Sequence, residues 1–376
     1  MNINFWPPLE LMAYSRIAQR ILYTFDLEIL KRTFLLGGPL YTEYRELIEE
    51  KVSAIVLPPF KTTYSSEVKQ LVLPTGIQKK LVGIVMALGF EVKTWFECHK
   101  LIVSDDYLNL RKQLHWFPFG IIDRHETARN FIQDVNFNIR ERFHLACVYY
   151  FGDDVQMLWR NMSTDDRFFV MRQLPRSRCL ELWLQTLQRN SSIDWEAISR
   201  NERRNFFRSN SLGIRRYFAN LRGPEMRYQC INYNLEIGNV HHFDLYSCIS
   251  LMNTNELNFM LRRLQTQEFC ELFKSFLQWP FQIMFLGIVN DFQQHISEDI
   301  FHGLVTIILY DKLGMGWQDH LYVDLFKCFW NLLAATYAAY VRNDKDLYVL
   351  VEYVLESSED FDMSEYLHLL NEYFSE

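Results

Sequence analysis

The sequence predicts an all-α protein, in which an irregular, solenoid-like array of helix pairs follows a smaller, mostly helical N-terminal region. Two observations support this fold class. From Glu126 onward, apolar residues recur with helical spacing in one segment after another, and short polar turns separate these segments. Two of the segments also resemble each other, which is typical of stacked helical repeats. A compact, non-repeating helical domain is the alternative.

The repeat consists of residues 154–174 and 244–264, which align without a gap at an offset of 90 residues. Each copy has apolar side chains at i, i+3, i+4 and i+7, then a short polar turn and a second apolar helix. The identical pairs are Asp154/Asp244, Met162/Met252, Thr164/Thr254, Phe169/Phe259, Arg172/Arg262 and Leu174/Leu264. The polar residues of the turn suit the N-cap of the second helix. One pair cannot bury so wide an apolar face, so we expect neighbouring pairs to stack, with an ankyrin-like stack as one variant.

The first part of the chain is less regular than the rest. Glycine and proline interrupt it at residues 37–39, 57–60 and 73–76. The sequence therefore predicts two domains, an N-terminal helical region at residues 1–123 and an α-helical repeat domain at residues 126–376.

The composition indicates a folded intracellular protein. Of its 376 residues, 49% are hydrophobic and 16% aromatic, and the formal net charge is −7. This acidic balance argues against broad nucleic-acid binding, which needs a basic face to neutralise phosphates. The seven scattered cysteines indicate reduced thiols, and the longest apolar stretches are too short to cross a bilayer. We expect a cytoplasmic protein, with the nucleus as the alternative, and neither a nucleic-acid nor a membrane partner.

The sequence contains no recognised enzyme signature. Phosphate-binding glycine loops, the GxSxG nucleophile motif and the HExxH zinc motif are all missing from it. His144 and Cys147 lack a second pair of ligands, so we expect them to pack in the core. His241 and His242 precede an expected helix, which suggests capping residues at the surface. We expect no catalytic residue, no metal site and no cofactor.

Pairs of acidic residues occur where helices are expected to begin, at Asp153, Asp154, Asp165 and Asp166. The unpaired amides and the positive end of the helix dipole stabilise carboxylates at such positions. We therefore expect these residues to support helix starts rather than to act as acid–base pairs or cation ligands.

The stretch PPLELMAYSRIAQRIL, residues 7–22, belongs to neither copy of the repeat. Its two prolines suit the first turn of a helix, where a missing amide hydrogen costs nothing. The apolar side chains then form one stripe, made of Leu9, Met12, Ala13, Ile17 and Ile21. Such a helix packs either on its own domain or in the groove of another protein, and periodicity does not separate the two.

These residues resemble the first part of a SOCS box, the module through which substrate receptors join Elongin–cullin ubiquitin ligases. In that family, the Elongin C-binding helix opens with a small residue or Pro and then Leu, followed at intervals of four by Cys and an aliphatic residue. The corresponding residues in this chain are Pro8, Leu9, Ala13 and Ile17, with Ala13 in the place where Cys is usual.

A second stretch, LPTGIQKKL, resembles the cullin-binding part of the same module. The corresponding residues are Leu73, Pro74, Ile77 and Leu81, and the LPPF stretch at residues 57–60 competes for the role. The stretch ERFHLACVYYFGDD, residues 141–154, also resembles a large set of spider SOCS-box proteins, in which the box precedes helical repeats.

The resemblance implies a substrate-recognition adaptor of an Elongin–cullin ubiquitin ligase. Its partners would be Elongin C, a cullin and a protein target held by the helical repeats. The adaptor would supply no reacting group, because the ligase acts by bringing the target close to a conjugating enzyme. The alternative is a helical-repeat scaffold with no link to ubiquitination, in which residues 7–22 only cap the stack.

Overall fold

The computed structural model describes residues 3–24, 75–103, 113–173, 178–195, 203–357 and 361–373. Throughout these ranges the regular elements are helices, and the only β-type pairing is an isolated bridge between Trp116 and Ile122. The predicted all-α, repeat-like fold is therefore confirmed. Among the helices of these ranges, none is both long enough and apolar enough to cross a membrane.

The chain forms two compact units, each assembled from separate segments. Unit 1 consists of residues 1–4, 94–117 and 121–275, and unit 2 of residues 5–93, 118–120 and 276–376. The predicted boundary between residues 123 and 126 does not coincide with this division, because unit 1 takes in residues from both sides of it and so does unit 2.

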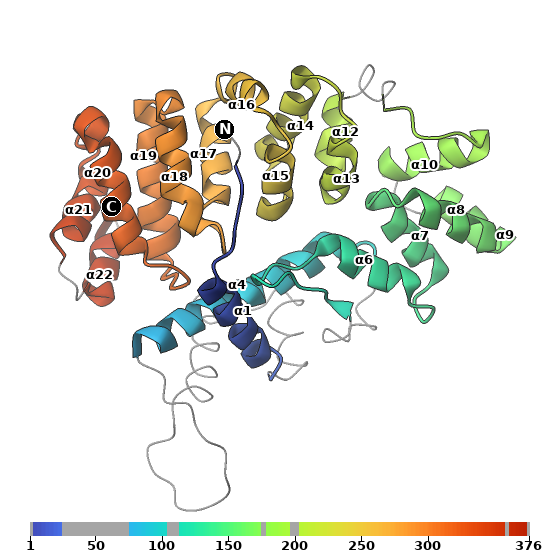
Figure 1. Ribbon diagram of the computed structural model, residues 1–376, viewed down its shortest axis with the longest axis horizontal. Helices are drawn as coiled ribbons and strands as arrows, with labels where there is room; N and C mark the ends of the chain where they lie inside the picture. Colours follow the sequence, from blue (N-terminus) through green and yellow to red (C-terminus); the bar gives the residue numbers. More distant parts are fainter. Residues whose placement is uncertain are drawn as a thin grey trace, which may run out of the picture. The chain divides into compact units, whose positions relative to one another are not determined.

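Unit 1 is built from short helices that pack against neighbours close in sequence. Helix α7 packs on α6, α8 and α10, and further along α14 packs on α12, α16 and α17. The helices are α6 (Arg124–Gln133), α7 (Ile139–Val148), α8 (Gly152–Asn161), α9 (Thr164–Gln173), α10 (Arg178–Arg189), α12 (Arg203–Ser209), α13 (Ile214–Phe218), α14 (Pro224–Ile237), α15 (His242–Ile249), α16 (Thr254–Leu261) and α17 (Thr266–Ser275). Helices α12 to α16 lie side by side, as Figure 1 shows, with α14 in contact with α12 and α16, and α13 in contact with α15.

The predicted repeat is visible as two helix–turn–helix units, α8–α9 and α15–α16. The second helix of each unit is capped at equivalent positions. The amide of Asp166 donates to Ser163 Oγ at 3.1 Å, and the amide of Glu256 donates to Asn253 Oδ1 at 3.0 Å. The amide of Asn253 donates in turn to the Glu256 carboxylate at 3.0 Å, which completes a capping box. The prediction that turn residues cap these helices is confirmed.

In each copy, an arginine from the preceding part of the chain forms an ion pair with an acidic residue in the first turn of the second helix. Arg140 of α7 lies 2.7 Å from Asp166, and Arg227 of α14 lies 3.1 Å from Glu256. These ion pairs join each repeat to the helix before it, so the stack is connected by polar as well as apolar contacts.

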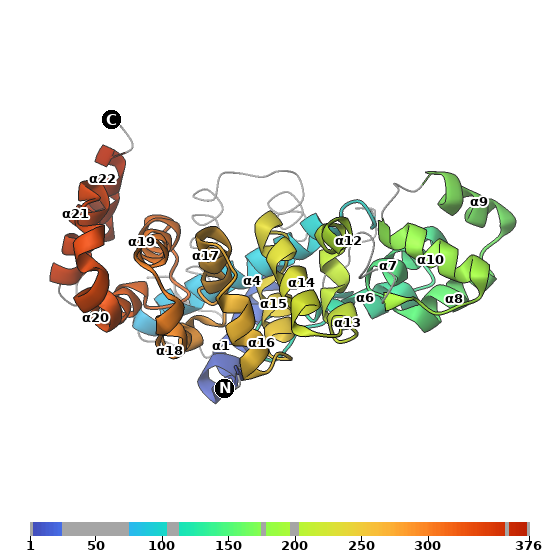
Figure 2. The same cartoon turned by 90° about the horizontal axis from the view of Figure 1, so that it is seen from above.

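Unit 2 combines the N-terminal helix with the C-terminal helices. Its helices are α1 (Leu9–Leu22), the part of α4 (Thr75–His99) up to residue 93, α18 (Gln282–Phe292), α19 (Glu298–Thr306), the π-helix η4 (Ile307–Gly314), α20 (Tyr322–Val341), α21 (Lys345–Glu356) and α22 (Met363–Tyr373). Helix α20 packs on α18, α19 and α21, and α21 packs on α22 (Figure 2). Phe301 and Phe329 are fully buried between these helices, with ring centroids 5.3 Å apart.

Helix α4 passes very close to the loop before α20. A Cβ atom added at Gly83 would lie 2.2 Å from the backbone carbon of Gln318 and 2.4 Å from the amide nitrogen of Asp319. Only glycine allows this approach, because a backbone cannot move aside as a flexible side chain can. The contact holds α4 in a fixed place in unit 2.

Candidate functional site

Helix α1 begins where the sequence predicts, directly after its two prolines. Pro8 is the N-cap, with φ −62° and ψ 151°, so the extended chain turns into the helix at Leu9. Glu10 in the first turn and Arg20 in the last turn complement the helix dipole. The helix ends at Leu22, and the Tyr23 amide bonds back to carbonyls of the last turn.

One face of α1 is buried in unit 2. The buried side chains are Leu11, Ser15, Ala18, Ile21 and Leu22. The single polar member of this face, Ser15, donates its hydroxyl to the Leu11 carbonyl at 2.8 Å, which satisfies the group without water. Helix α1 is therefore fixed on its own unit by a face that includes only one residue of the predicted apolar stripe, Ile21.

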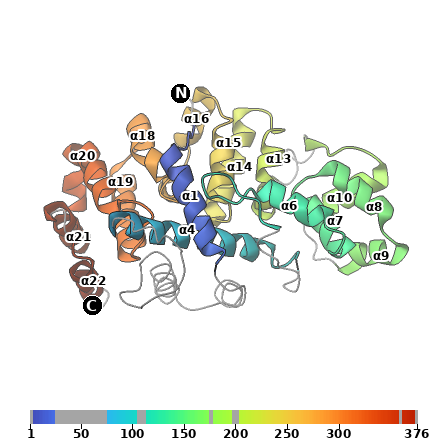
Figure 3. The ribbon, with the colours of Figure 1, turned by 60° about the horizontal axis from the view of Figure 1, so that its bottom comes forward.

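Helix α1 lies across α4 in unit 2, as Figure 3 shows. The residues of α1 that resemble the Elongin C-binding motif are not among its buried side chains. Pro8, Leu9, Ala13 and Ile17 are all exposed, with 81% of Leu9 and 45% of Ile17 accessible to solvent. Trp6, which the helical periodicity does not reach, is 83% exposed. Exposed large apolar side chains that gather on one face often mark a protein-binding site.

Two residues, Lys80 and Phe5, hold α1 and the segment before it in place. Lys80 of α4 donates to Glu10 at 3.1 Å, and its ammonium lies 4.6 Å from the centre of the Tyr14 ring. Before the helix, Phe5 packs edge-on against Phe119 and Phe281, with centroid distances of 5.3 and 5.0 Å. Helix α1 and the segment that leads into it are therefore both held by contacts within unit 2.

The residues that resemble the cullin-binding part do not form one exposed surface. Ile77 is half-buried in the first turn of α4, and Leu81, one turn later, is fully buried. Leu73 and Pro74 lie outside the described residues. A partner could reach Leu81 only if α4 moved away from its unit.

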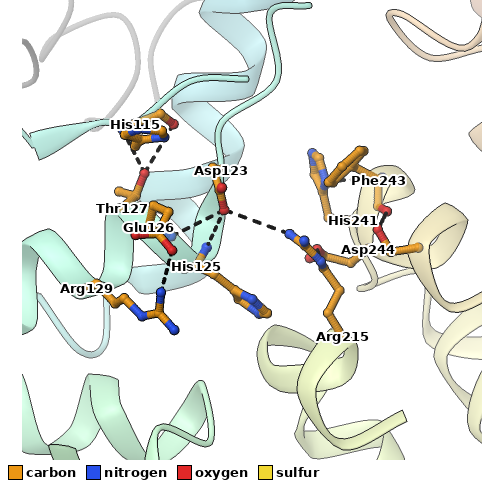
Figure 4. Close-up of polar contacts among 11 residues, drawn as sticks. His115, Asp123, His125, Glu126, Thr127, Arg129, Arg215, His241, Phe243 and Asp244 are labelled. Atoms are coloured by element: carbon orange, nitrogen blue, oxygen red, sulfur yellow. Dashed lines mark hydrogen bonds and ion pairs between the residues drawn. The ribbon is translucent and has the colours of Figure 1, made fainter. Parts of the chain in front are cut away.

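A second candidate is a polar cluster in unit 1, shown in Figure 4, where Arg215 of α13 lies between two carboxylates. Its Nη1 lies 4.0 Å from Asp123 Oδ1, and its Nε lies 3.8 Å from Asp244 Oδ1. Asp123 also caps α6, because its carboxylate accepts the amides of His125 and Glu126. The cluster thus connects α6, α13 and α15 by charge.

Two buried histidines beside this cluster, His125 and His241, are neutral at pH 7. Burial, with positive charge from Arg215, Arg216 and Arg129, lowers the pKa of His125 to about 3. Burial likewise lowers the pKa of His241 well below its usual value. A base with so low a pKa accepts a proton poorly near pH 7, so the cluster is not suited to general base catalysis. Its chemistry is that of a buried ion-pair network.

The other sequence-predicted polar groups have structural places. His144 and Cys147 are buried, as expected, and burial lowers the pKa of His144 to about 4. His241 caps α15, because its Nδ1 accepts the Phe243 amide at 3.3 Å. The expectation that His241 lies at the surface is wrong, because the helix start that it caps is itself buried.

The four acidic residues expected at helix starts are found there. Asp153 and Asp154 lie in the first turn of α8, and Asp165 and Asp166 in the first turn of α9. The prediction of their positions is confirmed.

Unit 1 also contains an open pocket of about 640 Å³. It is bordered by the segment before residue 196 and by the turn between α13 and α14. The lining residues are Ser192, Ile193, Asp194, Trp195, Ala219, Asn220, Leu221, Arg222 and Met226. The lining of the pocket includes both aromatic and charged side chains, such as Trp195 and Arg222.

Comparison with known proteins found no matching family model, no similar curated protein and no similar solved structure.

Proposed function

We propose that this protein is a substrate-recognition adaptor of an Elongin–cullin ubiquitin ligase. In this proposal, α1 docks into a groove of Elongin C through Pro8, Leu9, Ala13 and Ile17, and the helical repeats bind a protein target. The observation that carries the proposal is that these four residues are exposed together on a helix whose other face is already buried.

The geometry favours docking for two physical reasons. Burying a leucine as exposed as Leu9 contributes about 1.5–3 kcal/mol to binding. Helix α1 is also folded before it binds, because Leu11, Ala18 and Leu22 pack in unit 2. The partner therefore does not have to supply the free energy of helix formation.

The cullin contact in this proposal relies on Leu73, Pro74 and Ile77. Leu81 stabilises α4 from inside unit 2, so we leave it out of the docking surface. The pocket beside Trp195 and Arg222 in unit 1 is a candidate place for the target. The chain would act by proximity alone, because the conjugating enzyme supplies the reacting thioester.

The test is capture of the Elongin B–Elongin C complex by the purified full chain. We expect wild-type protein to retain the complex and Leu9→Asp to lose it, because a carboxylate cannot be buried in an apolar groove without a large penalty. Leu101→Asp is the matched control, since Leu101 is 78% exposed but lies in unit 1. Loss of capture with both variants, or with neither, contradicts the proposal.

The second candidate is a helical-repeat interaction scaffold without a ligase partner. The burial of Leu81 and the presence of Ala13 in place of Cys favour it. It predicts that neither wild-type protein nor any α1 variant captures the Elongin complex, while the pocket in unit 1 still binds a target.

A further inference from the structure

We infer that the docking surface of α1 is larger than the short motif, with Trp6 as a second apolar anchor and with Arg16 and Arg20 as a basic edge. The partner would then be a protein whose apolar groove is bordered by carboxylates. This inference rests on the proposed function and specifies the chemistry of the partner at the same surface.

Trp6 has the highest exposure among the large apolar side chains of the described residues, at 83%, followed by Leu9 at 81%. Only Pro7 and Pro8 separate the two in sequence. An exposed indole three residues before an exposed leucine offers a partner a second apolar group, and Trp is among the residues that most often dominate binding energy at interfaces.

The position of Trp6 is restricted on both sides. Phe5 is held between the rings of Phe119 and Phe281. The ring of Pro8, with φ −62°, fixes the chain where it enters the helix. Trp6 is therefore presented by a short, anchored segment, so that binding orders little additional chain.

The basic edge follows from helical geometry. Residues three, four, seven and eleven apart lie on one side of a helix, which places Arg16 and Arg20 beside Leu9 and Ala13. Both arginines are exposed, and neither forms an ion pair with another described residue. The one acidic residue of α1, Glu10, is paired with Lys80.

The exposed face of α1 therefore carries two available positive charges, on a chain whose net charge is −7. Positive groups beside an apolar stripe complement an apolar groove with a carboxylate rim, and such pairing sets association rate and specificity. The same combination also occurs in helices that lie on anionic membranes. The strongly negative net charge disfavours that alternative, because an anionic surface repels the chain as a whole.

The experiment measures the dissociation constant of the full chain with the Elongin B–Elongin C complex at about 50 mM and about 500 mM salt. We expect Trp6→Ala to weaken binding about tenfold or more at both salt concentrations. Arg16→Glu with Arg20→Glu should weaken it about tenfold at low salt and much less at high salt. The charge-matched control is Arg262→Glu with Lys345→Glu, two exposed residues that do not belong to α1.

The outcomes separate this inference from the proposed function. If wild-type protein binds and Leu9→Asp does not, while both new variants bind like wild type, the proposed function stands and this inference is overturned. If wild-type protein does not bind the complex at all, both are overturned. Trp6-dependent binding to vesicles of phosphatidylserine and phosphatidylcholine, without binding to the Elongin complex, also overturns the inference and assigns the face to membranes.

Discussion

The ammonium group of Lys80 in α4 lies 3.1 Å from the carboxylate of Glu10 in α1. The same ammonium lies 4.6 Å from the centre of the Tyr14 ring, one turn further along α1. One lysine therefore contacts two successive turns of the proposed docking helix. Because Leu11, Ala18 and Leu22 already bury the other face of α1 in unit 2, the Lys80 contact fixes the orientation of the helix more than it contributes to its folding.

We predict that Lys80→Ala loosens α1 without unfolding unit 2. The ion pair is partly exposed, and together with the cation–π contact it is worth about 1 kcal/mol or less. Hydrogen exchange should show faster exchange of the α1 amides, with little change in melting temperature. The control is Lys79→Ala, an exposed neighbour. Equal exchange rates in the two variants would show that Lys80 does not hold α1.

The close approach of α4 to residues 318 and 319 gives a second prediction. Gly83→Ala should destabilise the protein by about 1–3 kcal/mol, because the new methyl group overlaps backbone that must shift. Denaturant unfolding measures the effect. Gly76→Ala is the matched control in the same helix, where an added Cβ meets nothing within 4 Å.

The control variant should be neutral or stabilise the protein by up to about 1 kcal/mol, since alanine restricts the unfolded chain. If both glycine variants change the free energy of unfolding alike, the approach of α4 to residues 318 and 319 does not restrict the side chain at position 83.

The sequence predicted local structure well because local structure follows from neighbouring residues. Helical spacing and the polar turns were enough to place α8–α9 and α15–α16, and the caps at Ser163 and Asn253 follow from the same residues. The division into two units could not be predicted in this way. It depends on contacts between distant segments, such as the packing of Phe5 on Phe281.

The candidate site was predicted only in part, for similar physical reasons. Periodicity identified an apolar stripe on α1 but could not tell which face the unit would bury, and the buried face proved to be centred on other residues. Trp6 was missed because it precedes the helix, where no period applies. Leu81 matched a short motif, yet its burial depends on the tertiary packing of α4, which a motif does not record.

The Arg215 network gives a third prediction. Arg215→Met should destabilise the protein by about 1–3 kcal/mol, because it removes a cation that lies 4.0 Å from the Asp123 carboxylate and 3.8 Å from the Asp244 carboxylate. Denaturant unfolding measures the loss. Arg216→Met is the control, an exposed neighbour on the same helix, and should cost less than about 1 kcal/mol.

Adding Asp244→Asn to Arg215→Met should recover part of the lost stability, since a neutral amide then replaces a carboxylate that has lost the attraction of Arg215. A purely additive double variant would mean that the two residues do not interact.

The last prediction concerns pH and the buried His99. Its Nδ1 lies 2.5 Å from the carbonyl of Trp95, which can only accept, so Nδ1 carries the proton and Nε2 accepts the Tyr149 hydroxyl at 2.8 Å. Desolvation by burial lowers the pKa of His99 to about 3. The unfolded chain has an ordinary histidine, with a pKa of about 6.5. Between these values the unfolded state binds a proton that the folded state does not.

The contribution of His99 to stability is therefore complete above pH 6.5 and is lost as the pH falls toward 3, by about 1.4 kcal/mol per pH unit. His125, with a pKa lowered to about 3, acts in the same direction. We expect the free energy of unfolding to fall as the pH is lowered from 6.5 to 4. His99→Gln should make this fall less steep, because it removes the contribution of one histidine, about 1.4 kcal/mol per pH unit. His115→Gln, at an exposed site, is the control. If His99→Gln and His115→Gln give the same slope as wild type, His99 already takes up its proton in the folded protein over this pH range.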